Sequence, residues 1–429
     1  MRSSLLRRRV ATALGIYGST ALGIVGSLVV LRVLGPTEAG RFSIVVGAAA
    51  FFQLLLELTS DEALVKYGFR YAAREDWGRF RRLVQLTFGF ELVASLVAGG
   101  IVAALAPFTG DIFNGGSGLT VPMLLAALLP PLQAIESMAA AALILRSRYD
   151  IRGLFLTLSM GLRLVGLVLG TQRGVTAAVL GVLAAQIVTT ASIVAVGIAA
   201  LRRFPAAAPT PLGDDARPVL RFVVQSSIGT GLVSLRTWIA PLTLGIVRTA
   251  TDVGLFRGAQ APQNGFAALS APVRLILLTE QTRDWERGKP ELVFAGLRRY
   301  VVGSTLLMAL ALAPLEWAMP WLIRVFLKPA YLPATEAARL VLGAAAIQLI
   351  LGWTKSFPVT IGRPGLRILA HGVETAVLLP LIVVFGKLWG VTGAGAAVLA
   401  SSVAFGLVWA VLVVRLRNGG LPRFEVTPA

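Results

Sequence analysis

Residues 10–34 read VATALGIYGSTALGIVGSLVVLRVL, and residues 41–58 read RFSIVVGAAAFFQLLLEL. Each stretch is close to the roughly 20 apolar residues that a helix needs to cross the hydrocarbon core of a bilayer. The intervening GPTEAG, residues 35–40, supplies a glycine and a proline, which interrupt helices. The pattern predicts two membrane-spanning helices joined by a short turn. The first run is also longer than the apolar core of a signal peptide, typically about 7–15 residues, so a cleaved leader is disfavoured.

The same pattern recurs along the whole chain. Hydrophobic residues make up 56% of the 429 residues and charged residues 14%, whereas soluble domains typically carry about 25% charged residues. We therefore predict an all-α integral membrane protein with about twelve transmembrane helices. The predicted segments are 10–34, 41–58, 83–106, 120–145, 153–170, 175–201, 218–247, 254–279, 296–319, 336–354, 366–386 and 391–414.

The net charge of +19 reflects basic residues between the apolar runs, not a soluble nucleic-acid-binding face. With the N-terminus inside, the cytoplasmic segments hold 28 Lys and Arg residues and the outer segments hold eight. Cytoplasmic loops of membrane proteins carry such an excess of basic residues. The count predicts a multi-pass protein with both termini in the cytoplasm and no nucleic-acid partner.

The chain also repeats internally. Residues 174–188 and 390–404 are identical at seven of fifteen positions, and both open with Gly-Val-Thr. Thr37 to Phe42 likewise matches Thr251 to Phe256 at a similar spacing. Two six-helix halves are therefore expected, related by a pseudo-two-fold axis along the membrane normal, with any substrate path between them. The predicted division is an N-terminal bundle at 1–201, a cytoplasmic linker at 202–217, a C-terminal bundle at 218–415 and a cytoplasmic tail at 416–429.

Three features resemble one family of transporters: the Leu34-Gly35-Pro36…Gly40-Arg41-Phe42 junction, the basic stretch 66–82 and the Gly-Val-Thr opening. They are similar to the Wzx-like polysaccharide-biosynthesis flippases of the multidrug/oligosaccharidyl-lipid/polysaccharide (MOP) exporter superfamily. The resemblance implies two pseudo-symmetric bundles around a central cavity that operate by alternating access. It also implies that an undecaprenyl-diphosphate-type lipid carrying an oligosaccharide moves from the inner to the outer leaflet of the bacterial cytoplasmic membrane.

Arginines within the predicted spans are the candidate substrate-binding residues. A guanidinium group binds phosphate oxygens bidentately, and a charge in the membrane normally faces a wet cavity or a partner. Arg236 and Arg163 lie near the middle of their spans, and Arg274 lies in the eighth, where the resemblance implies a substrate-binding arginine. The alternative is that they form structural ion pairs with buried carboxylates. Arg32 and Arg41 flank the outer junction and are candidates for a gate, although snorkelling to the interface is favoured.

Acidic residues and the single histidine are candidates for a gate or for ion coupling. They are Glu57, Glu91, Glu136, Glu374 and His371. A carboxylate in an apolar site can take up a proton, so H⁺ or Na⁺ is the candidate coupling ion. Neutralisation of an intramembrane arginine is the favoured alternative. Without cysteine and with one histidine, the chain has no thiolate or His-based metal site, and no metal or cofactor is expected.

Other functions remain open at this point. A cation-coupled drug or small-molecule antiporter of the same superfamily would favour acidic residues over arginine in its cavity. An intramembrane sugar polymerase or ligase is expected to need a large outer loop with catalytic groups, and the outer stretch 107–120 holds only Asp111 as an ionisable residue. We therefore expect a monomeric transporter and not an enzyme, with a lipid-linked oligosaccharide and membrane lipid as its partners.

Overall fold

A computed structural model describes residues 2–56, 60–114, 118–266, 281, 284–285, 287–361, 363 and 365–418. Within these ranges the side chains of residues 2–14, 60–61, 225–226, 228–230, 232–236, 290, 359 and 417–418 are not described. By contacts the chain divides into a first unit, Met1–Gly254, and a second unit, Leu255–Ala429. This division reflects which residues pack together. The division into two repeat halves, at 1–201 and 218–415, stays a prediction.

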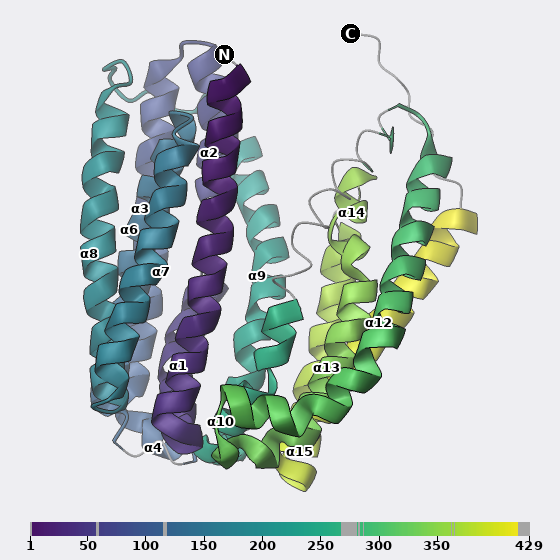
Figure 1. Cartoon of the computed structure of the whole chain (residues 1–429). Helices are drawn as coiled ribbons and strands as arrows, with labels where there is room; N and C mark the ends of the chain where they lie inside the picture. The colour runs from purple at the N-terminus through teal and green to yellow at the C-terminus, as the bar shows by residue number, and fades with distance from the viewer. Residues whose placement is uncertain are drawn as a thin grey trace. The chain divides into compact units, whose positions relative to one another are not determined.

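Helices account for nearly all of the described part of the first unit (Figure 1). Its elements are α1 (Arg2–Leu56), α2 (Ser60–Ala73), α3 (Trp77–Leu105), η1 (Ala106–Phe108), α4 (Thr109–Ile112), α5 (Thr120–Ala126), α6 (Leu129–Leu145), α7 (Tyr149–Thr171), α8 (Val175–Arg202), η2 (Gly213–Asp215), α9 (Ala216–Val247) and the start of α10 (Ala250–Ala259). The second unit holds the end of α10, a helical stretch at 261–266, α12 (Pro290–Phe326), η3 (Pro329–Ala334), α13 (Thr335–Ile350), η4 (Gly352–Lys355), α14 (Phe357–Thr360) and α15 (Gly365–Asn418).

Each of the twelve predicted spans lies largely in helix in the described residues, the eighth as far as residue 266, with turns at 127–128 in the fourth span, 260 in the eighth and 351 in the tenth. Seven of the described helices are long and apolar enough to cross a membrane by themselves. Two of these, α1 and α15, each contain two predicted spans, because Gly35 (φ 73°) and Gly390 (φ 58°) interrupt the helical backbone. Residues other than glycine rarely adopt such positive φ values. Gly174, which opens α8 in the matching repeat, also has a positive φ of 96°, so the repeated Gly-Val-Thr begins a helix in the same way twice.

Small residues allow the helices of the first unit to approach closely. Gly166 of α7 faces Gly181 of α8, and a Cβ atom added at Gly166 would lie 2.6 Å from the carbonyl carbon of Gly181. In a membrane, helices associate largely through van der Waals packing, so glycines that bring backbones together favour their pairing. The packing places α7 between α1 and α8, and α1 and α7 lie side by side (Figure 1).

The sequence repeat contains two Thr-x-x-Gly motifs, Thr37 to Gly40 and Thr251 to Gly254. They pack against each other within the first unit. The hydroxyl groups of Thr37 and Thr251 are 2.9 Å apart. A Cβ added at Gly40 would overlap the carbonyl oxygen of Ala250, and one added at Gly254 would overlap that of Pro36. Each residue of the second motif lies 214 positions after its counterpart in the first, and each motif makes the same contacts with the other. The arrangement is therefore locally two-fold symmetric.

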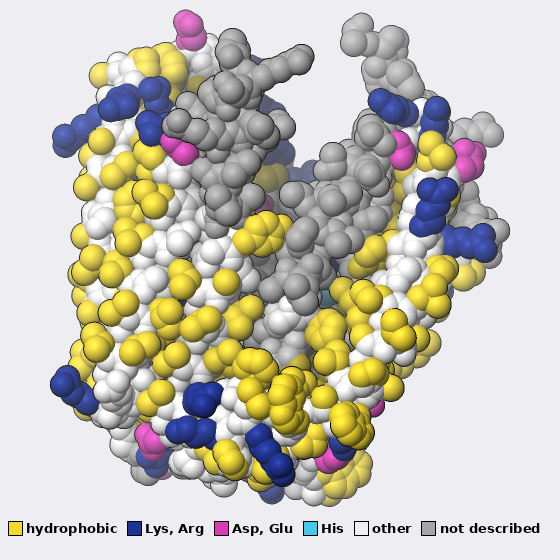
Figure 2. Space-filling view, viewed as in Figure 1, with side chains coloured by type: hydrophobic (Ala, Val, Ile, Leu, Met, Phe, Trp, Pro, Cys, Tyr) yellow, Lys and Arg dark blue, Asp and Glu magenta, His cyan; other side chains and the backbone are white. Residues whose placement is uncertain are grey.

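The surface of the helices suits a hydrocarbon solvent. In the first unit, Figure 2 shows hydrophobic side chains over the middle of the helices and Lys and Arg toward their ends. Leu169 in the first unit and Leu310 in the second are 63% and 77% exposed. Such large exposed apolar side chains are favourable in lipid and costly in water. The chain is therefore a multi-pass membrane protein.

Aromatic side chains form the core at one end of the second unit. Trp353 lies with its ring centroid 5.4 Å from that of Trp409, and Phe357 is fully buried beside Trp353. They join residues of α12, α14 and α15 in one cluster. The short η4 and α14 segments between α13 and α15 are thus held by the packing of their own large side chains.

Candidate anion-binding site

A cavity of about 460 Å³ lies within the first unit. Most of its lining is apolar, and its polar groups come from Gln53, Gln133, Trp238 and Arg163. The other lining residues are Leu22, Gly23, Gly26, Phe42, Val46, Ala49, Ala50, Leu54, Leu129, Met160, Leu164, Leu167 and Val182. An apolar cavity with a few polar groups and one cation has the general character of a ligand site.

The sequence of α7 explains why Arg163 lines this cavity. Met160, Arg163, Leu164 and Leu167 follow the spacing that places residues on one face of a helix. The facing part of α1 carries glycines, and even a Cβ added at Gly26 would lie 3.3 Å from Leu167. Gly26 therefore lets α1 approach α7 closely, whereas a Cβ added at Gly23 would meet only Met160 Sδ, at 4.0 Å, so α1 leaves open space there.

The charge of Arg163 is opposed by that of Glu136 on α6, which interacts with it electrostatically. Glu136 accepts a hydrogen bond from the side chain of Gln186 on α8. Gln186 also donates to Thr190 Oγ1 at 3.1 Å, and the Thr190 hydroxyl donates to the backbone carbonyl of Leu132 at 3.2 Å. The network fixes the carboxylate, while Arg163 Nε is buried with no hydrogen-bond partner in the described structure. A buried donor of this kind normally has a partner, so the site has unused capacity for an acceptor.

The remaining predicted residues of the first unit lie elsewhere. Arg32 is exposed, and Arg41 forms an ion pair with Glu38 at 2.8 Å, so its charge is already neutralised. Glu91 is buried on α3, with 5% of its surface exposed. Glu57 lies outside the described residues, as does the side chain of Arg236 within α9.

In the second unit, Arg274 lies outside the described residues. His371 and Glu374 form one buried pair, with His371 Nδ1 3.0 Å from Glu374 Oε2 and the imidazole stacked on Phe405. By the 216-residue offset between Gly174 and Gly390, the position that matches Arg163 is Leu379. The cation of the cavity is thus absent from the matching position of the other half.

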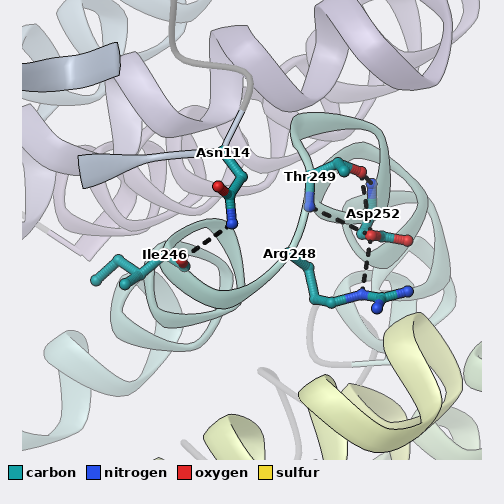
Figure 3. A network of polar contacts seen from close by, with 5 residues as sticks. All are labelled: Asn114, Ile246, Arg248, Thr249 and Asp252. Carbon is teal, nitrogen blue, oxygen red and sulfur yellow. Dashed lines mark hydrogen bonds and ion pairs between the residues drawn. The ribbon is translucent and has the colours of Figure 1, made fainter. Parts of the chain in front are cut away.

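A polar network closes the turn between α9 and α10 (Figure 3). Asp252 accepts hydrogen bonds from Arg248 Nε at 3.2 Å and from the hydroxyl group of Thr249 at 3.1 Å. Asn114 donates to the carbonyl oxygen of Ile246 at 3.4 Å, and its own carbonyl oxygen accepts from the backbone N–H of Ala250 at 3.0 Å. Arg248 is therefore paired with Asp252, and the network holds the second Thr-x-x-Gly motif in position.

Residues 204–215 of the linker dock on the ends of α2 and α3, a contact that was not predicted from the sequence. Phe204 is buried, with its ring centroid 4.8 Å from that of Phe80. Arg81 donates to the carbonyl oxygen of Phe204 at 3.1 Å. Asp215 accepts a hydrogen bond from the hydroxyl group of Tyr71 at 3.1 Å and lies 3.6 Å from Arg79. A lone aromatic residue in a proline- and alanine-rich linker was the signal for this docking.

Comparisons with known proteins agree with these observations. The chain is similar to a lipid II flippase, MurJ, in an inward closed conformation, with 13% identity, a TM-score of 0.75 and coverage of 94% of this chain and 87% of that one. It is also similar to an inward-facing multidrug-resistance MATE family transporter of the MOP superfamily, with 13% identity, a TM-score of 0.71 and coverage of 96% and 100%.

A third similar structure is a MOP superfamily transporter from Pyrococcus furiosus that is described as having a binding pocket of reverse polarity. It shares 16% identity with this chain, with a TM-score of 0.60 and coverage of 97% of both chains. At these identities the likeness establishes the fold, and it confirms the predicted all-α membrane fold of MOP transporters. In a comparison with curated proteins, none matches the chain.

A family model supplies the remaining evidence. The model described as "Polysaccharide biosynthesis protein" matches residues 5–270, which is more than half of the chain. The matched region includes the whole cavity, the docked linker and both Thr-x-x-Gly motifs. The chain therefore belongs to the polysaccharide biosynthesis protein family.

Proposed function

We propose that the protein is a flippase that moves a lipid-linked oligosaccharide, with an undecaprenyl-diphosphate-type carrier, from the inner to the outer leaflet of the bacterial cytoplasmic membrane. The observation that carries the proposal is the placement of Arg163 on the wall of a cavity within the membrane-spanning bundle. Membership of the polysaccharide biosynthesis family supports it as well. Alternating access, cytoplasmic termini and a monomeric state complete the proposal.

The depth of Arg163 suits the central task of a flippase. Arg163 is the fifteenth residue of α7, which begins at Tyr149, so it lies about 21 Å along a helix that is roughly 34 Å long. A diphosphate headgroup has to cross this depth while its lipid tail stays in hydrocarbon. An arginine here lowers the free energy of the anion because it supplies charge-assisted hydrogen bonds where water is scarce.

Glu136 acts as the counter-charge of Arg163 when the cavity is empty. A buried cation without any compensating charge costs several kcal/mol. The arriving diphosphate takes over the neutralisation of Arg163. Glu136 is also the proposed ion-coupling carboxylate, with H⁺ or Na⁺ as the coupling ion. Arg236 and Arg274 are proposed as further substrate-binding residues.

A cation-coupled antiporter of the same superfamily is the second candidate. The similarity in fold to MATE transporters supports this possibility. A cationic drug would be repelled by Arg163, so we favour the anionic lipid as the substrate.

The proposal is tested in proteoliposomes that contain a lipid diphosphate with a fluorescent sugar. Wild-type protein should expose the sugar to an external quencher. Arg163→Ala should abolish this transport, and Arg163→Lys should retain part of it. Arg173→Ala is the matched control, because Arg173 is exposed just beyond the other end of α7. Unchanged transport by folded Arg163→Ala protein, or transport of cationic dyes in place of the lipid, would contradict the proposal.

A further inference from the structure

Arg152 is a second arginine of α7 with an unsatisfied donor. It lies in the first turns of the helix, and its side chain is half-buried. Its Nε atom is buried with no hydrogen-bond partner in the part of the chain that the structure describes. A buried polar atom in this state costs free energy unless another group supplies an acceptor. Among the described residues, Arg163 and Arg152 share this property on one helix.

The nearby acidic residue does not neutralise Arg152. Asp150 is engaged by Arg148, whose Nε and Nη2 atoms lie 3.2 and 3.4 Å from the two carboxylate oxygens. No ion pair of Arg152 itself occurs among the described residues. Among the described residues, the start of α7 therefore holds one arginine in an ion pair and one arginine without an ion pair.

Helical geometry places Arg152 in line with Arg163. Eleven residues separate them, which corresponds to about three full turns, a rotation of about 20° and a rise of about 16.5 Å. The two side chains thus leave the same face of α7. Next to Arg152, Gly153 packs against Gly15 of α1, where an added Cβ would lie 2.6 Å from the Gly153 Cα atom. The same α1–α7 contact opens farther along into the cavity that Arg163 lines.

We propose that Arg152 is the first binding site for the diphosphate group on its way to Arg163. This inference rests on the proposed function and names the residue that loads its cavity. Side chains on one helix lean in the same direction along its axis, so the two guanidinium groups keep a separation of about 16.5 Å, which is too long for one diphosphate, and the sites act in sequence. Arg152 captures the anion near the helix start and raises its local concentration, and Arg163 stabilises it at mid-membrane. The chemistry recognised is a diphosphate ester, and the sugar is not read at this site.

The two arginines should therefore differ in their effects on transport. Arg152→Ala should raise the substrate concentration for half-maximal transport by about tenfold, the value of one lost charge-assisted hydrogen bond, with little change in the maximal rate. Arg163→Ala should instead remove transport at every substrate concentration. Arg152→Lys should restore most of the lost affinity, and Arg152→Gln, which keeps hydrogen bonding without charge, should not. A merely structural role of Arg152 would lower the amount of folded protein and leave the half-saturation of the folded fraction unchanged.

Transport of the fluorescent lipid diphosphate is measured in proteoliposomes, with inorganic pyrophosphate, farnesyl diphosphate and farnesol as competitors on the loading side. Competition by farnesyl diphosphate and pyrophosphate that weakens in Arg152→Ala supports the inference, whereas competition by farnesol assigns recognition to the lipid tail and overturns it. Wild-type half-saturation in folded Arg152→Ala protein, or in Arg152→Gln if the alanine variant does not fold, also overturns it. If wild-type protein moves no lipid diphosphate, the proposed function itself fails. If wild-type protein transports it and the Arg152 variant has the same half-saturation, only the inference about Arg152 fails.

Discussion

Substitution of Gly40 by alanine probes the contact between the two Thr-x-x-Gly motifs. A Cβ at this position would overlap the Ala250 carbonyl oxygen and lie 2.7 Å from the Ala250 carbonyl carbon, whereas ordinary contacts begin at 3.4 Å. The atoms in the way belong to the backbone and cannot rotate aside, so the two segments have to separate. Overpacking typically costs about 1–3 kcal/mol, and we expect the upper end of that range here.

Separation also breaks the hydrogen bond between Thr37 and Thr251, which is 2.9 Å long and contributes about 1 kcal/mol. The total loss of about 4 kcal/mol corresponds to a fall in Tm of about 4 °C for a chain of 429 residues, since the entropy of unfolding is about 2 cal/mol/K per residue. Thermal unfolding in detergent, followed by size-exclusion chromatography of the surviving protein, measures this shift. Gly89→Ala in α3 is the matched control, because no atom lies within 4 Å of its added Cβ. Equal Tm values for the two variants would refute the motif contact.

Three further outcomes follow from the described contacts. Burial, and after it the hydrogen bond to Asp215, raises the pKa of Tyr71 from 10.0 to about 12. Because the folded state holds this proton more tightly than the unfolded state, stability should be lost as the pH rises from about 10 through 12. The tyrosinate absorbance of wild-type protein, compared with that of Tyr71→Phe, should show that this one group titrates late. Phe204→Ala empties a buried position of the docked linker and should cost about 3 kcal/mol, with faster tryptic cleavage after Arg203 as the measurement and an unchanged cleavage rate as the contrary result. Glu136→Gln removes the charge that interacts electrostatically with Arg163 and should destabilise the protein by about 1 kcal/mol; the double variant with Arg163→Ala should recover much of the loss in thermal unfolding, and additive losses would show that the two groups do not interact.

Much of the fold could be predicted because the relevant information is local. Whether a segment crosses the membrane depends on the hydropathy of about 20 consecutive residues, so the span that became α8 was readable from its own sequence. Gly35 and Gly390 were also visible, since a helix that must bend sharply needs a residue that tolerates a positive φ. The fourth predicted span, 120–145, shows the limit of this reasoning. It consists of two helices, α5 and α6, because Pro130 and Pro131 favour a new helix start after a turn.

The candidate site was only partly accessible from the sequence. Arg163 was identified as an intramembrane charge, but its partner was not, since Glu136 lies 27 residues away on a different helix. Gln186, which fixes the carboxylate, carries no charge and gave no signal in the sequence. Arg152 lies near a predicted cytoplasmic end, where basic residues are ordinary, and only the burial of its Nε atom distinguishes it.

The order of the apolar segments, the bias of basic residues and the internal repeat are readable from the sequence alone, because each depends on neighbouring residues or on a fixed offset along the chain. Only the tertiary structure decided that Gly40 meets the second copy of its own motif, that Arg163 faces a cavity next to Glu136, and that Phe204 fastens the linker to α3. In a helix of known hydropathy, every rotation about the axis satisfies the bilayer nearly equally. The packing of small residues between helices selects one rotation, and that selection determines which polar side chains meet.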